Sequence, residues 1–341
     1  MSALTFRAPV SSPAVRWRLW RFIGIALVAP AFIASASAQP QQTYPNRPIR
    51  FVVALAAGAG TDVAARLFAQ KLTDAFGQQV VVDNRPGASG MIATDLVAKA
   101  SPDGYTLITA TTIQTSLPAL RKNLPYDIIK DFAPVSLLID YPLLLVVHPS
   151  VPAKSVKELI ALAKARPGQI NYGSSGAGSA AHLNSELFKS ETRINLVHVP
   201  YKSIANAVIG TIAGENTLGF YSVSTILTHV KTGKLRALAT TGAKRSPSVP
   251  DLPTIAEAAG VPGYDVMSWV GVLVPAGTPK SIITKLHGEF TRVLRLPDVK
   301  ERLASLDFES VGSTPEEFAT YMKKELATWA RVMKESGIKA D

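Results

Sequence analysis

Residues 49–77 read IRFVVALAAGAGTDVAARLFAQKLTDAFG. The segment begins with an apolar run over residues 49–55, interrupted only by Arg50, which is typical of a strand buried on both faces. A turn of small residues follows. Apolar residues between 63 and 76 then recur near helical spacing until Gly77 ends the pattern. A buried strand, a tight turn and a helix in this order indicate an α/β fold.

The rest of the chain repeats this alternation, so we expect an α/β architecture with mostly parallel sheets. Thr314 with Glu317, like Ser155 with Glu158, has the spacing of a capping box, and Thr278 precedes a proline as an N-cap would. The sequence predicts further strands at 80–82, 105–111, 143–147, 170–173, 196–199, 218–221 and 235–240, and helices at 155–164 and 315–336.

The N-terminal segment has the pattern of a secretory signal peptide. Three arginines between positions 16 and 21 precede an apolar stretch over residues 22–33, and Ala36-Ser37-Ala38 resembles a cleavage site. The alternative is a membrane anchor, but the apolar stretch is short for a span of about 20 residues. We therefore expect residues 1–38 to be removed and the protein to lie in the periplasm.

Composition narrows the possible functions of the mature chain of about 303 residues. The chain has no cysteine, which excludes disulfides, thiolate metal sites and cysteine nucleophiles. The first 38 residues carry four arginines and no acid, so the net charge falls from +11 to +7 after cleavage. This charge is scattered without long basic runs, and we expect no nucleic-acid partner. No later apolar run is long enough to span a membrane, so we expect a soluble mature protein.

The turn after the first strand is the first candidate binding site. Small residues let the backbone approach a ligand, and a helix N-terminus offers free N–H groups and a partial positive charge. This geometry suits a carboxylate, although a βα turn without a ligand is the alternative. Val63 stands where a dinucleotide fingerprint needs its third glycine. The candidate residues are Gly58, Ala59, Gly60, Thr61 and Asp62.

A second glycine-rich loop, residues 172–182, also joins a predicted strand to a helix. It satisfies a loose G-x-G-x-x-A pattern, but Glu191 lies too near for the acid that binds ribose, and export separates the chain from cytosolic nicotinamide. We expect no cofactor here, but a second helix N-terminus that faces an anion. His182 either contacts the ligand or is satisfied by hydrogen bonds in the protein. The candidates are Ser175, Gly176, Gly178, Ser179 and His182.

Catalytic patterns are missing from the sequence. The five histidines have no metal-binding spacing, and we expect no metal site. A Gly-x-Ser-x-Gly nucleophile elbow starting at Gly87 is not completed, because Met91 occupies the last position. A binding protein is therefore favoured over an enzyme.

Short motifs run through nearly the whole mature chain, from about Tyr44 to Gly337. They are YPNRPI (44–49), GTD (60–62), DNRPGA (83–88), SPDGYTL (101–107), LPYD (124–127), HVPYK (198–202), GKLRAL (233–238), KRSP (244–247) and PAGTP (275–279). In this order they resemble the Bug family, the substrate-binding receptors of tripartite tricarboxylate transporters.

The resemblance implies a type II periplasmic-binding-protein fold, with two α/β lobes, a ligand cleft between them and hinged closure. It implies that the turn after the first strand clamps a ligand carboxylate. The family often has consecutive glycines where this chain has Ala59, and an acid that can meet an amino group where it has Tyr221, which disfavours an amino-acid ligand. The expected site also includes Thr111, Thr112, Tyr201, Tyr221 and Ser222.

The sequence therefore predicts a monomeric periplasmic receptor that captures a small organic acid for the membrane subunits of a tripartite transporter. Two alternatives remain: an enzyme on the same scaffold, and a sensory subunit that passes ligand occupancy to a signalling partner. We expect the chain to cross between lobes near Tyr141-Pro142 and to return near 238–241. The predicted parts are the signal peptide (1–38), lobe I (44–141 and 239–341) and lobe II (142–238).

Overall fold

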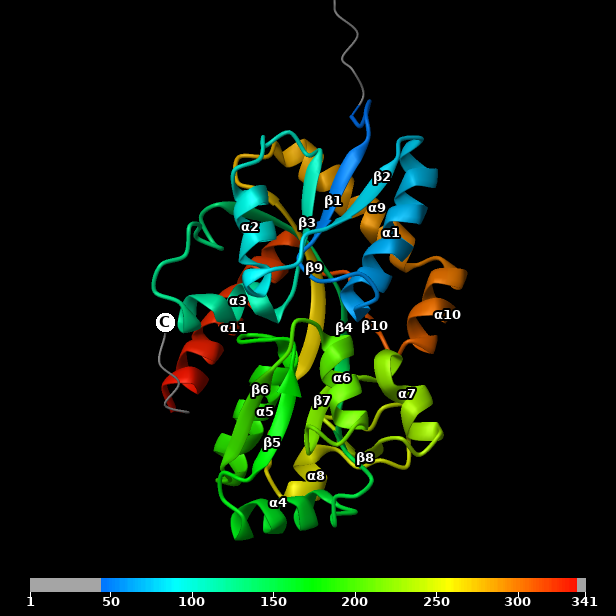
Figure 1. Ribbon diagram of the computed structural model, residues 1–341. Helices are drawn as coiled ribbons and strands as arrows, with labels where there is room; N and C mark the ends of the chain where they lie inside the picture. The colour runs from blue at the N-terminus through cyan, green and yellow to red at the C-terminus, as the bar shows by residue number, and fades with distance from the viewer. Residues whose placement is uncertain (1–43, 336–341) are drawn as a thin grey trace, which may run out of the picture. The chain divides into compact units, whose positions relative to one another are not determined.

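The structure, a computed structural model, describes residues 44–335 (Figure 1). The predicted signal peptide and the last residue of the predicted C-terminal helix lie outside the described residues. The strands of this part hydrogen-bond in the order β2-β1-β3-β9-β4-β7-β5-β6, with β10 and β8 also paired to β4. The strands are β1 (Ile49–Val53), β2 (Val80–Asn84), β3 (Thr106–Ala110), β4 (Phe132–Val147), β5 (Ile170–Ser174), β6 (Leu196–Pro200), β7 (Leu218–Ser222), β8 (Arg236–Thr240), β9 (Met267–Pro275) and β10 (Glu309–Ser310).

Strand β4 is the element that joins two sheet sections. Residues 132–142 of β4 pair with β9, and residues 143–147 pair with β7 and β8. In Figure 1, β4 and β9 run along the middle of the view, between the blue and cyan elements above and the green elements below. The sequence predicted only the second half of β4, because the pattern of a 16-residue strand does not show that its pairing partners change partway.

The expectation of mostly parallel sheets is wrong for the centre of the molecule. β1 pairs with β2 and β3 in parallel, and β5 pairs with β6 and β7 in parallel. Every pairing of β4 and β9 within the described part is antiparallel. The parallel pairs belong to βαβ units, which need crossover helices, whereas β4 and β9 are long strands that run in opposite directions between the two sections.

Helices cover both sections of the sheet. The predicted helix after β1 is confirmed, and Gly77 ends it in a left-handed conformation with φ 64°. The sequence did not predict the helix at 112–120, which contains Pro118. The helices are α1 (Gly60–Phe76), η1 (Ala88–Gly90), α2 (Met91–Ala98), α3 (Thr112–Leu120), α4 (Val156–Ala165), α5 (Ala180–Thr192), α6 (Ile204–Ile212), α7 (Val223–Lys231), α8 (Ile255–Ala259), α9 (Lys280–Leu294), α10 (Pro297–Ser305) and α11 (Pro315–Glu335).

The predicted caps have mixed outcomes. Thr314 and Glu317 form the expected capping box, with reciprocal bonds of 3.2 and 2.9 Å. Ser155 accepts the Glu158 amide, but the Glu158 carboxylate accepts the amide of Lys154, so only half of that box forms. The N-cap of α9 is Pro279, because the Thr278 hydroxyl donates to the Pro275 carbonyl.

Residues after β8 keep contacts with the second sheet section. Thr241 receives a hydrogen bond from the Val266 amide, and its own amide donates to the Leu143 carbonyl. Helix α8, further along the chain, packs against α4 of the second section. Within the same stretch the Ser246 hydroxyl donates to Asp307 at 2.8 Å, shortly before β10.

Candidate functional site

Five helices begin at one cleft. The first residues or N-caps of α1, α3, α5, α6 and α7 line two adjoining pockets, which share Leu55, Ala59, Ile113, Ser175, Ser179, Ile204 and Thr225. The inner pocket is lined in addition by Gly60, Thr61, Thr111, Thr112, Tyr141, Leu143, Ala180, Ala181, Phe220, Tyr221, Ser222, Ser268 and Trp269. The outer pocket is lined in addition by residues 54, 56–58, 86–90, 176, 177, 201–203 and 205.

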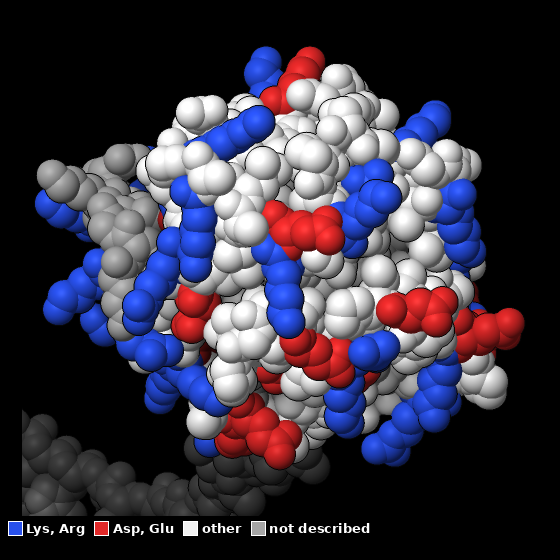
Figure 2. Space-filling view, turned by 90° about the horizontal axis from the view of Figure 1, so that it is seen from below, with Lys and Arg blue, Asp and Glu red and all other residues white. Residues whose placement is uncertain are grey.

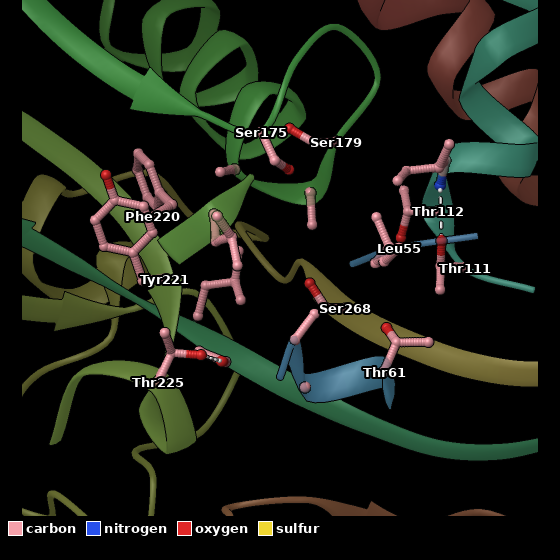
Figure 3. A pocket seen from close by; sticks show the side chains of 18 of the residues that line it. Leu55, Thr61, Thr111, Thr112, Ser175, Ser179, Phe220, Tyr221, Thr225 and Ser268 are labelled. Carbon is pink, nitrogen blue, oxygen red and sulfur yellow. Dashed lines mark hydrogen bonds between the residues drawn. The ribbon is translucent and has the colours of Figure 1, made fainter. Parts of the chain in front are cut away.

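The inner pocket is polar without being charged. Ten of its lining residues carry a hydroxyl group, and none is Lys, Arg, His, Asp or Glu. Figure 3 shows the hydroxyls of Thr61, Ser268 and Ser175 around the same space. The N-termini of helices supply N–H donors and partial positive charge. The pocket can therefore hold an anion by amides and hydroxyls, without a cationic side chain.

Charged side chains lie elsewhere on the molecule. The outer pocket has one charged lining residue, Lys202. On the face drawn in Figure 2, lysines and arginines are interspersed with aspartates and glutamates, and no block of one sign dominates.

Asp62 stabilises the turn after β1 from behind the pocket. Its carboxylate accepts bonds from the Gly58 amide at 2.9 Å, from Arg66 at 3.0 Å and from Asn84 at 2.9 Å. Burial opposes ionisation, but these hydrogen bonds outweigh it and hold the pKa of Asp62 below its ordinary value. Asp62 lines neither pocket, and the Gly58 amide is already bonded.

The first amides of α1 are not capped by a side chain. The N-cap is Ala59, which has no polar group, and no side-chain cap bond forms there. Gly60 and Thr61 line the inner pocket. Free N–H groups at the start of a 17-residue helix are the donors that a carboxylate would take.

The glycine-rich loop after β5 approaches the cleft from the second section. Ser175 and Ser179 line both pockets, and Gly176 lines the outer one. Gly178 and His182 line neither pocket. His182 is 4% exposed, and its Nδ1 accepts the Gly178 amide at 3.3 Å. This geometry favours the alternative that His182 is satisfied within the protein.

The end of β7 provides an aromatic wall. Tyr221 lines the inner pocket, but its hydroxyl bonds with Thr211 at 2.8 Å and with the Ala207 carbonyl at 3.1 Å, on α6. Burial raises the pKa of Tyr221, so the phenol stays neutral. Ser222 is the N-cap of α7 and shares a 2.7 Å hydrogen bond with Thr225.

The remaining predicted residues have distinct positions. Thr111 caps α3 in a capping box with Gln114, and Thr111 and Thr112 both line the inner pocket. Tyr201 lines the outer pocket, where its hydroxyl donates to Glu215 at 3.1 Å. The structure therefore brings twelve of the fifteen predicted residues to the cleft and places Asp62, Gly178 and His182 behind it.

Residues 64–338 match the family model described as "Tripartite tricarboxylate transporter family receptor". The chain belongs to this family. It is 37% identical over 327 residues to the protein BugT of Bordetella pertussis, which covers 94% of this chain and 98% of BugT.

Solved structures agree with this assignment. The receptor superposes on Rpa4515 of R. palustris, solved with adipate, with a TM-score of 0.83 at 38% identity, over 87% of this chain and 100% of that one. It also superposes on MatC (Rpa3494) of Rhodopseudomonas palustris, which was solved with bound malate. The TM-score is 0.79 at 31% identity, over 85% of this chain and 99% of MatC. The fold is that of the periplasmic binding proteins, and the receptor is a solute-binding protein of the tripartite transporter class, whose receptors work with membrane subunits.

Residues 44–335 hold neither a metal-binding cluster nor a membrane-spanning helix. No group of three or more histidines and carboxylates in that range could hold a metal ion. No helix there has both the length and the apolar character required to cross a membrane.

The sequence reasoning missed the floor of the receptor's inner pocket. Tyr141 and Leu143 on β4, and Ser268 and Trp269 on β9, line it between the two sheet sections. Burial raises the pKa of Tyr141 to about 12, so its phenol stays neutral. The one local signal was Ser268, a hydroxyl within an otherwise apolar strand. It is 2% exposed, and its Oγ has no hydrogen-bond partner in the structure.

Proposed function

We propose that the receptor binds a small carboxylate in the inner pocket through the N-termini of helices. The observation that carries this proposal is the meeting of five helix starts at a pocket lined by ten hydroxyls and by no charged side chain. In such a site a carboxylate replaces its hydration shell by amide and hydroxyl donors.

The proposed ligand is a dicarboxylate without an amino group. Rpa4515 was solved with adipate and MatC with malate, which are both dicarboxylic acids. An ammonium group would need an acceptor of opposite charge, and no carboxylate lines the inner pocket of this receptor. Apolar walls from Leu143, Phe220 and Trp269 suit the carbon chain between two acid groups.

The proposed ligand contacts come from both sheet sections. We assign the carboxylate to the amides of Gly60 and Thr61, and further hydrogen bonds to the hydroxyls of Ser175, Ser179 and Ser268. Asp62 supports this site by ordering the turn.

The change of β4 partners after Pro142, and the start of β9 at Met267, support lobes made of residues 44–142 with 267–335 and of residues 143–266. We propose that these two lobes close on the ligand.

We further propose that the receptor is a monomer without enzymatic activity and that its signal peptide is cleaved near Ala38.

The test is a binding screen on the purified mature chain, residues 39–341, with dicarboxylates of two to six carbons, among them malate and adipate, and with the dimethyl esters of these two acids. A dicarboxylate at 100 times its dissociation constant should stabilise the protein by about 2.7 kcal/mol, which a rise in melting temperature reports. The esters have the same carbon skeleton without charge and should produce no rise. Equal shifts from esters and acids, or no response to any small dicarboxylate of two to six carbons, would contradict the proposal.

A further inference from the structure

A buried aromatic and ionic cluster lies directly behind the loop that carries Ser175 and Ser179. The rings of His182 and His198 have centroids 4.4 Å apart, and His198 stacks on Tyr172 at 5.0 Å. The Tyr172 hydroxyl donates to Glu186, which also pairs with Lys189 at 2.8 Å. None of these five residues lines the inner or the outer pocket.

Hydrogen bonds connect this cluster to the backbone of the loop. His182 Nδ1 accepts the Gly178 amide at 3.3 Å, and Ser179 Oγ accepts the His182 amide at 3.3 Å. Ser174 Oγ bonds with His198 Nε2 at 2.6 Å and accepts the Gly176 amide at 3.0 Å. The two histidines therefore contact the loop at both ends.

Gly178 is constrained on its other side by α3. Its carbonyl accepts the Ser116 hydroxyl at 3.0 Å, and its backbone has φ +78°. A Cβ atom there would lie 3.0 Å from Ser116 Oγ and 3.1 Å from Leu120, so a side chain would be strained by the positive φ and would press on α3. The orientation of the Gly178 peptide fixes the next residue, Ser179, which lines both pockets and caps α5.

We propose that His182, in its neutral form, is a positioning residue that holds the 174–179 loop in its ligand-binding conformation by accepting the Gly178 amide. The inference rests on the proposed carboxylate site, because the loop presents Ser175 and Ser179 to that site. An amide donor requires Nδ1 without a proton, so the single ring proton is on Nε2. If His182 were protonated, its Nδ1–H would face the Gly178 N–H. Two donors cannot form a hydrogen bond with each other, so the loop would be released.

The surroundings of His182 keep it neutral. Burial, then the neighbouring His198, and then the positive charge of Lys189 lower the pKa of His182 to about 3. The titratable and charged groups that face it are Tyr172 from β5, His198 from β6, and Glu186 and Lys189 from α5. The neutral acceptor therefore persists across the physiological pH range.

The first test needs no ligand. Nitrogen NMR of the mature chain should show His182 as the neutral Nε2–H tautomer from pH 5 to pH 8. The Gly178 amide should exchange with solvent more slowly in the wild type and in His182→Asn, whose Oδ1 replaces Nδ1, than in His182→Leu, which has no acceptor. A protonated His182 at pH 5, an Nδ1–H tautomer, or equal exchange in all three proteins would overturn the inference.

The second test is calorimetric titration with adipate. His182→Leu should bind about threefold to tenfold more weakly than the wild type, the effect of one lost neutral hydrogen bond, and His182→Asn should stay within about twofold. Thr192→Val is the matched control, since that buried hydroxyl near the end of α5 donates to the Phe188 carbonyl, away from the loop and from both pockets. It should lower stability without changing affinity.

The outcomes separate the two proposals. A wild type that does not bind adipate counts against the proposed ligand class, while the tautomer and amide exchange still decide the role of His182. A wild type that binds adipate, with His182→Asn as weak as His182→Leu, overturns the positioning role alone.

Discussion

Asp140 and Glu309 lie directly opposite each other where β4 pairs with β10. Asp140 Oδ1 is buried and has no hydrogen-bond partner in the structure. Burial, and then the charges of Glu309 and Asp265, raise the pKa of Asp140 to about 6. Like charges opposite each other in a sheet are destabilising. Ionised Asp140 therefore lowers the stability of the folded protein at β4, the strand that joins the two sheet sections.

The pH dependence of stability follows from the sign of that shift. The pKa of Asp140 is raised above the 3.8 of an unfolded chain, so the folded protein loses stability as pH rises from about 4 through 6. Asp140→Asn should raise the free energy of unfolding by roughly 1–2 kcal/mol at pH 7.5, since water screens part of the repulsion at this partly exposed group, and should change it little at pH 4. Urea unfolding at both pH values measures this. Glu309→Gln, which removes only the neighbouring charge, should give a smaller gain at pH 7.5. An equal gain at both pH values would show that charge is not the cause.

Helices and strands were predictable where the signal is local. The strand, turn and helix over residues 49–77 follow from an apolar run, small residues and helical spacing, and the structure confirms them. Helix α3 was missed because a run of threonines and Pro118 disfavours a helix, while its capping box and the burial of seven of its nine residues stabilise it. Tertiary packing overrides propensity in this element.

The candidate site was also predictable only where its residues belong to a local strand-to-helix turn. The loops after β1 and β5 are local strand-to-helix turns, and their small residues indicated an anion site on each. Whether a side chain points into or away from the cleft depends on contacts far along the chain. Asp62 points away because the side-chain amide of Asn84, 22 residues later, donates to its carboxylate. Ser268 and Trp269 reach the pocket because β9 lies beside β4, which no local pattern shows.

The molecule as a whole should close on its ligand. The proposed contacts come from both sheet sections, so a ligand that touches both binds the closed state more tightly and shifts the population by that difference. Small-angle scattering should show a smaller radius of gyration with saturating adipate than without it, and no decrease with dimethyl adipate. An unchanged radius at saturation would contradict hinged closure.

The start of α1 allows one amide donor to be removed with little other change. Gly60 is the first residue of the helix, where proline is well tolerated, and Ala59 before it has φ −68° and ψ 155°, which proline permits. Gly60→Pro therefore removes the N–H and keeps the backbone. Gly60→Ala is the matched control, because it keeps the N–H. Its Cβ would lie 3.4 Å from Phe308, in the same place as the Cβ of the proline, so the two variants add the same contact. Thr61→Val tests the neighbouring hydroxyl alone.

The deciding measurement is the affinity of Gly60→Pro and Gly60→Ala for adipate by isothermal titration, after both are shown to be folded. Losing one hydrogen bond to a charged group corresponds to about a tenfold to hundredfold loss of affinity. We predict that loss for Gly60→Pro, a smaller one for Thr61→Val, and near wild-type binding for Gly60→Ala. A folded Gly60→Pro that binds adipate as tightly as Gly60→Ala would contradict the assignment of the carboxylate to the N-terminus of α1.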